Sequence, residues 1–164
     1  MCRLLAITSK NHVSPALAIN GLAAMREGYD GSGVGMLLRD LGGPFKNMSD
    51  IPVLSGIFSS SGLKRLDRFM MEKGFTTKYK ITFKTNGEPP AGVPKRDVYL
   101  VRAYDYPNDW ESLGAQDRLK QLMPIRLELK KMGEAEKDMA VFSFWPDTIM
   151  IKEVGDPVAV ANYL

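Results

Sequence analysis

The sequence is poor in the side chains that form disulfides and metal sites. It contains one cysteine, Cys2, and one histidine, His12, among 164 residues. A single cysteine excludes an internal disulfide framework, and one histidine with scattered carboxylates gives no spacing typical of a metal site. We therefore expect no metal in this chain and a reducing compartment, which favours the cytoplasm.

Long apolar runs and a dominant charge are also missing. No stretch approaches the roughly 18 apolar residues that a membrane-spanning helix needs, and the first residues lack the apolar core of a signal peptide. The 22 basic and 19 acidic residues are interspersed and give a net charge of +3, which only weakly favours nucleic-acid binding. Neither a membrane nor a nucleic acid is expected as a partner.

The residues that are present suffice for one domain over 1–164, because 45% of them are hydrophobic. Ser14-Pro15 before an apolar pattern predicts a helix over about 15–27, and a second amphipathic pattern predicts one over 63–73. A third helix over 110–132 should kink or break at Pro124, and Asp156-Pro157 begins a fourth.

Strands are expected at 3–8, 78–84, 97–103, 139–144 and 148–154. A sharp turn is expected at 40–45, and Trp145-Pro146-Asp147 should join the last two strands as a hairpin. Along the chain, some predicted strands follow another strand and others follow a helix. This mixed order favours the α+β class. Because the chain stops soon after its last predicted helix begins, we expect it to be the first part of a larger domain.

The strand over 78–84 alternates basic and aromatic side chains. Tyr79 and Phe83 share one face, and the lysines share the other. A sheet that stacks nucleic-acid bases would combine both kinds on one face. The alternation therefore favours core packing of the aromatic rings.

Cys2 lies one cleavage away from the N-terminus. Removal of Met1 would place a thiol, with a pKa near about 8.5, and an α-amine, with a pKa of about 7.7 to 8.0, on the same residue. Such a residue has its own nucleophile and its own base. The other interpretation is a small buried side chain at the start of the first strand.

A glycine-rich turn, Gly28-Tyr29-Asp30-Gly31-Ser32-Gly33, follows the first predicted helix and leads into a strand. This order is the reverse of a dinucleotide-binding fingerprint. Gly28 suits a helix C-cap, and the other glycines allow close backbone approach beside an N-terminal nucleophile. Asp30 is expected to accept backbone N–H groups within the turn.

In combination, Met1-Cys2, the Ser14-Pro15 helix start and the turn from Gly28 to Gly33 resemble the class II glutamine amidotransferases. The segments 40–45 and 155–157 are similar to the amidotransferase component of the glutamate synthase group. The resemblance implies the αββα sandwich of N-terminal-nucleophile hydrolases, of which this chain would be the N-terminal part. It also implies that Cys2 is the nucleophile, with Gly28, Tyr29, Asp30, Gly31, Ser32 and Gly33 as the active-site turn.

The implied reaction is hydrolysis of glutamine to glutamate and ammonia through a cysteine thioester. This chain would carry no cofactor, whereas a partner synthase subunit would hold FMN and an iron-sulfur cluster and pass ammonia to an acceptor such as 2-oxoglutarate. A homo-oligomer is compatible with the sequence. Asn86-Gly87 has the letters of the family's oxyanion pair, but its early place in a Pro-rich loop favours coincidence. The alternative function is a noncatalytic interaction or regulatory module that keeps part of the fold.

Overall fold

The computed structural model describes residues 4–25, 33–83 and 85–164. The chain packs as two compact units. Unit 1 comprises Met1–Gly35, Lys84–Lys95 and Lys152–Leu164, and unit 2 comprises Met36–Phe83 and Arg96–Ile151. None of the helices in the described part of the chain is both long and apolar enough to cross a membrane.

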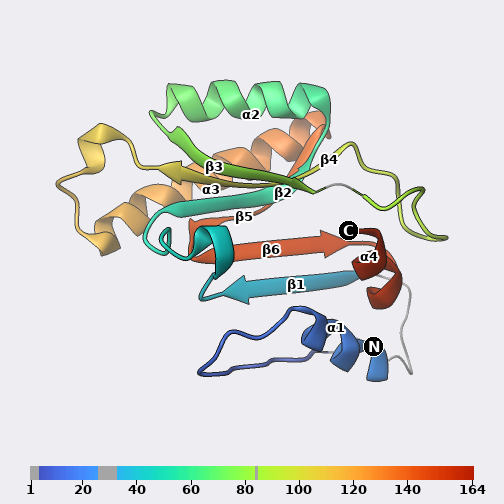
Figure 1. Cartoon of the computed structure of the whole chain (residues 1–164). Coiled ribbons are helices and arrows are strands. Elements are labelled where there is room, and N and C mark those ends of the chain that lie inside the picture. The colour runs from blue at the N-terminus through green and yellow to red at the C-terminus, as the bar shows by residue number, and fades with distance from the viewer. Residues whose placement is uncertain (1–3, 26–32, 84) are drawn as a thin grey trace. The chain divides into compact units, whose positions relative to one another are not determined.

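Unit 2 contains a four-stranded antiparallel sheet with a β-α-β-β-α-β chain path. Its elements are β2 (Pro52–Phe58), α2 (Ser60–Glu72), β3 (Thr76–Phe83), β4 (Val98–Asp105), α3 (Ala115–Glu136) and β5 (Met139–Pro146). The strand order is β3-β4-β2-β5, so that β4 lies between the strands that α2 connects (Figure 1). This is the split β-α-β arrangement of ferredoxin-like folds. The predicted α+β class is confirmed, whereas this strand order was not predicted.

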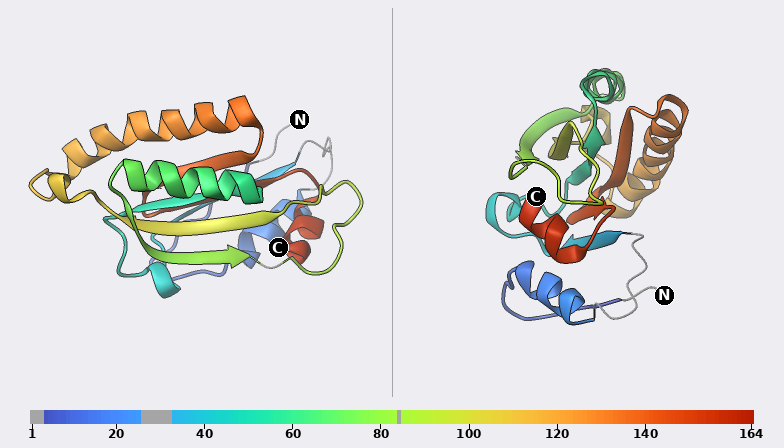
Figure 2. Two further views of the ribbon diagram at one scale, coloured as in Figure 1. Left: turned by 90° about the horizontal axis from the view of Figure 1, so that it is seen from above. Right: turned by 90° about the vertical axis from the view of Figure 1, so that its right-hand side faces the viewer.

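Both helices of unit 2 pack on the same face of this sheet (Figure 2). Leu66 of α2 and Leu122 of α3 are fully buried there. Below them, the ring of Phe75 meets those of Tyr104 and Phe144 edge to face, with centroids 6.2 and 5.4 Å apart. Aromatic pairs prefer this geometry, which makes the helix face of the sheet the larger core.

The opposite face of the sheet packs against a second, two-stranded sheet of β1 (Val34–Arg39) and β6 (Thr148–Glu153). Ile149 of β6 lies in the same apolar cluster as Val53 and Val101 of the larger sheet. Tyr79 also packs in this cluster, with its ring 5.4 Å from that of Phe45, and Phe83 joins it. Core packing of both aromatic residues is confirmed. Unit 2 thus has three layers, in the order helices, sheet, sheet.

The second predicted helix is confirmed, with a start three residues earlier than expected. Ser59 caps it, because its Oγ accepts the backbone N–H of Gly62 at 3.0 Å. Gly74 follows its end with φ of 81°, a left-handed conformation that favours glycine at this position. The strand predicted over 78–84 is confirmed as β3, and that over 97–103 as β4.

The predicted hairpin at Trp145-Pro146-Asp147 is wrong, because β5 and β6 belong to different sheets. Asp147 has φ of 49°, and the chain turns there from the larger sheet into the smaller one. The Asp147 carboxylate accepts the backbone N–H groups of Asp40 and Leu41, both at 2.9 Å. This contact fixes the predicted turn at 40–45, which is confirmed and contains the short 3₁₀ helix η1 (Gly43–Phe45).

The predicted break at Pro124 is also wrong, because α3 continues through it from Ala115 to Glu136. Pro124 lies on the exposed side of the helix, while Leu122, Ile125 and Leu129 hold the other side in the core. A proline inside a helix costs about 3 kcal/mol, which the burial of this apolar side offsets. The helix also begins later than predicted, after a 3₁₀ turn over Asn108–Trp110, η2.

In unit 1, the first predicted helix is confirmed in a shorter form as α1 (Ala16–Ala24). The backbone N–H of Ala16 donates to Ser14 Oγ at 3.3 Å, in agreement with the predicted start. The predicted strand over 3–8 is wrong for Leu4 to Thr8, which form no strand. Leu4 is 89% exposed, so the apolar composition of this segment does not reflect a buried strand.

The last predicted helix is confirmed as α4 (Pro157–Tyr163). The Asp156 carboxylate caps it by accepting the backbone N–H groups of Val158 and Ala159, at 3.0 and 3.2 Å. Val160 and Tyr163 pack against Val93 of the Pro-rich loop and form the small core of this unit.

Candidate functional site

Most of the predicted site residues lie outside the described residues. This applies to Cys2 and to Gly28, Tyr29, Asp30, Gly31 and Ser32. Their predicted roles, including the proximity of the turn to Cys2, stay predictions, with one exception. The prediction that Gly28 caps the first helix is wrong, because α1 ends at Ala24 and its C-cap is Met25. Gly33, the last residue of the turn, is described.

Gly33 occupies a position that only glycine fits. Its φ is 130°, and a Cβ atom there would lie 2.6 Å from the carbonyl oxygen of Glu153. Both the dihedral angle and this close approach exclude a larger side chain without rearrangement. Gly33 therefore leads into β1 beside the backbone of the segment that precedes α4.

The segment opposite Gly33 is itself held in place. Glu153 is 6% exposed, and its Oε1 accepts the backbone N–H of Val154 at 2.8 Å. Gly155 follows with φ of 131°, and a Cβ atom on it would lie 2.6 Å from Val93. The chain thus passes from β6 into α4 through a tight turn, in which the Glu153 carboxylate and the Val154 N–H form a hydrogen bond.

Asn86 of the Asn86-Gly87 pair binds the end of α4. Its backbone N–H donates to the carbonyl oxygen of Tyr163 at 2.8 Å, and its Nδ2 donates to that of Asn162 at 2.9 Å. These carbonyl groups at a helix end need partners from outside the helix. Asn86 therefore has a structural role that accounts for its presence in this loop.

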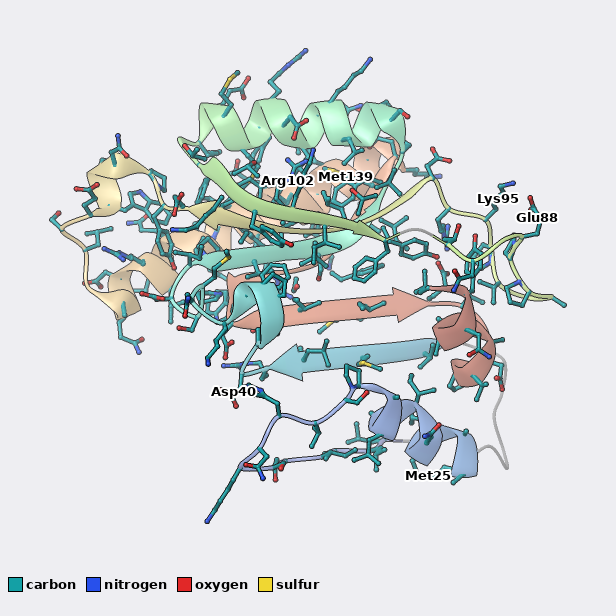
Figure 3. The ribbon with its side chains drawn as sticks, viewed as in Figure 1. Met25, Asp40, Glu88, Lys95, Arg102 and Met139 are labelled. Atoms are coloured by element: carbon teal, nitrogen blue, oxygen red, sulfur yellow. The ribbon has the colours of Figure 1, made fainter. Side chains whose placement is uncertain are left out.

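The same loop contains an exposed ion pair between Glu88 and Lys95, at 3.2 Å (Figure 3).

A buried arginine in unit 2 was missed by the sequence analysis. Arg102 on β4 is 7% exposed and lies beneath α2 (Figure 3). Its Nη1 donates to Oδ1 of Asp67 on α2 and, at 3.2 Å, to the hydroxyl of Tyr104. Its Nε is buried and has no hydrogen-bond partner among the described residues. A charge inside an apolar strand is tolerated because these partners compensate for lost hydration.

The electrostatics of this group oppose proton transfer near neutral pH. Burial alone would lower the pKa of the Arg102 guanidinium, but the effects of Tyr104 and Asp67 outweigh it and the pKa is raised. Burial raises the pKa of Tyr104 to about 12, against the opposing effect of Arg102. Near neutral pH the Arg102 guanidinium therefore stays charged and the Tyr104 hydroxyl stays neutral. Groups that keep their protons are better suited to holding α2 against the sheet than to acid–base catalysis.

Replacing Tyr104 by Phe tests this arrangement through its pH dependence. The pKa of Tyr104 is raised on folding, from 10.0 to about 12, so its contribution to stability is complete below pH 10. The contribution falls as the pH rises toward 12, because the unfolded chain ionises first, and about 2 to 3 kcal/mol is lost. Denaturant unfolding across this range should show a shallower decline for Tyr104→Phe than for the wild type. Identical slopes would contradict the assignment.

Two buried serines were also missed. Ser55 of β2 and Ser143 of β5 share a hydrogen bond of 2.5 Å between their Oγ atoms. Ser55 Oγ donates to the carbonyl oxygen of Met150 at 2.7 Å and accepts its N–H at 3.1 Å. Both hydroxyls therefore connect the larger sheet to β6. The pattern of the three strands contains no local signal for a contact between residues so distant in sequence.

In the part of the chain that the structure covers, no three His, Cys, Asp or Glu residues lie close enough together to hold a metal ion. We compared the chain with protein-family models, with curated proteins and with solved structures. None of these comparisons found a match.

Proposed function

We propose that this chain is the glutamine-hydrolysing component of a glutamate-synthase-like system. The observation that carries the proposal is the position of its only cysteine, directly after Met1. The glycine-rich turn supports it, because Gly33 at its end is required by both φ and close approach. The Ser14-Pro15 start of α1, upstream of this turn, completes the pattern that resembles class II amidotransferases.

The proposed reaction begins once Met1 has been removed. The thiol proton of Cys2 passes to the α-amine of the same residue, and the thiolate attacks the side-chain amide carbon of glutamine. The resulting tetrahedral intermediate takes the proton back on its nitrogen and expels ammonia, which leaves a glutamyl thioester. Water then hydrolyses the thioester to glutamate and regenerates the thiol.

The proposal includes an αββα sandwich as the fold. Unit 2 contains three layers in the order helices, sheet, sheet, as part of such a sandwich would, but its larger sheet has the split β-α-β strand order. It also includes a synthase partner that holds FMN and an iron-sulfur cluster and consumes the ammonia. Because free ammonia is protonated in water, direct transfer to such a partner would preserve its nucleophilicity.

The free α-amine can be tested separately from the thiol. A form that begins at Cys2 should be compared with a form in which a noncleavable preceding segment keeps Met1. General-base catalysis contributes about 10²- to 10⁴-fold, so ammonia release from glutamine should be slower by this factor in the second form. Equal rates in the two forms would contradict the proposed role of the amine.

A further inference from the structure

The positive charge of the chain is concentrated in the segment that contains α2 and β3. Residues 60–83 carry six basic and two acidic side chains, a net charge of +4, whereas the whole chain carries +3. The rest of the chain is therefore slightly acidic. Such asymmetry indicates a surface that attracts acidic partners.

Several of these cations are already paired within unit 2. Arg65 binds Asp138 at 3.1 Å, Lys73 binds Glu128 at 2.7 Å and Lys78 binds Asp105 at 2.9 Å. By contrast, Lys64 and Lys80 are exposed and form no ion pair with any residue that the structure describes.

Both lysines lie on the side of the larger sheet that the two helices cover. Lys80 pairs across the ladder with Arg102, and cross-strand partners project from the same face of a sheet. Lys64 precedes Asp67, the partner of Arg102, by three positions and therefore shares its side of α2. Because Asp67 already pairs with the guanidinium of Arg102, it does not neutralise Lys80. Lys80 is therefore available to bind an external anion.

β3 forms an edge of the four-stranded sheet (Figure 2). Within the described residues, β4 is its only strand neighbour. The strand is eight residues long, from Thr76 to Phe83. Its outer edge therefore presents backbone N–H and C=O groups that another extended chain can bind.

The two faces of β3 differ in chemistry. Lys80 is exposed on the helix side, whereas Tyr79, Ile81 and Phe83 are half-buried on the other side, in the apolar cluster between the sheets. A second copy of this strand would place lysines beside lysines, which is repulsive. A strand that alternates acidic and aliphatic residues would match both faces.

We propose that the outer edge of β3 binds an extended acidic segment of a partner protein, which adds to the sheet as a further strand. Its carboxylates lie beside Lys80, and its aliphatic side chains cover the exposed edges of Tyr79, Ile81 and Phe83. Backbone hydrogen bonds supply affinity, and Lys80 supplies selectivity for acidic side chains. The proposal concerns unit 2 and does not depend on catalysis by Cys2.

The test uses a fluorescent peptide of alternating Glu and Val and measures anisotropy with the full chain at low salt. We expect saturable binding, and no binding of the corresponding Lys–Val peptide. Lys80→Glu should weaken binding about tenfold, since attraction becomes repulsion between neighbouring strands. Lys131→Glu makes the same charge change at an exposed position on α3 and should leave the affinity unchanged.

A second peptide separates strand addition from simple charge attraction. Methylation of the backbone nitrogens of its Val residues removes donors on one edge but leaves every carboxylate, so binding should be lost. Equal binding of this peptide, no effect of Lys80→Glu, or no binding of the acidic peptide would overturn the proposal. Tighter, Lys80-dependent binding of a single-stranded DNA oligonucleotide would also overturn it and indicate a nucleic-acid surface.

Discussion

Cys2→Ala is expected to abolish the hydrolysis of glutamine by this chain. In the proposed mechanism the thiol forms the bond that is later hydrolysed, and no other group of the chain replaces it. Loss of a catalytic nucleophile lowers turnover by about 10⁴-fold or more. Ammonia release by the wild type and the variant, measured side by side on chains that begin at residue 2, tests this expectation.

Cys2→Ser is the matched variant for this experiment. It keeps a hydroxyl group and the α-amine, but a serine hydroxyl has a much higher pKa than a thiol and needs stronger activation. We therefore expect its turnover to lie between those of Cys2→Ala and the wild type, or to equal that of Cys2→Ala. Wild-type turnover in Cys2→Ala would exclude Cys2 as the nucleophile.

Gly62→Ser is expected to destabilise unit 2. Gly62 lies in the first turn of α2, where a Cβ atom would collide with the carbonyl oxygen of Asp138, just before β5. Because Ser59 N–H donates to this same oxygen at 2.9 Å, the backbone there is not free to move. Overpacking of this kind costs about 1 to 3 kcal/mol.

The cost should appear as a fall in Tm of about 5 to 10 °C, measured by circular dichroism. Gly114→Ser is the matched control. Gly114 precedes α3, has φ of −66° and has open space around its Cβ position. Since serine is favoured at a helix N-cap, this variant should keep or slightly raise the Tm. An unchanged Tm for Gly62→Ser would mean that α2 and β5 do not approach each other this closely.

The elements that the sequence predicted correctly are those with local signals. The amphipathic pattern of α2 and its end at Gly74 follow from the local sequence, although the helix starts three residues before the predicted Leu63, after its cap Ser59. The alternation of Lys80 and Ile81 along β3 assigns each residue to its face. Asp156-Pro157 marks the start of α4 in the same way. Each of these signals acts within a few residues of the element it defines.

The features that were missed depend on residues distant in sequence. Whether β5 and β6 form a hairpin depends on Asp147, whose carboxylate binds the turn after β1. Arg102 is tolerated in a buried strand because Asp67 on α2 compensates its charge. Leu4 to Thr8 have the composition of a strand but no strand neighbour among the described residues. At the candidate site, Gly33 shows the close backbone approach expected of the glycines, whereas Gly28 is not the helix cap that the sequence predicted.

The most direct test of the proposed function is the intact mass of the purified chain after incubation with an electrophilic glutamine analogue. One spectrum reports the loss of Met1 and any covalent adduct. The proposal predicts a species without Met1 that carries a single adduct, which excess glutamine suppresses and Cys2→Ala abolishes. A chain that has lost Met1 but remains unmodified, or an adduct that persists in Cys2→Ala, would contradict it.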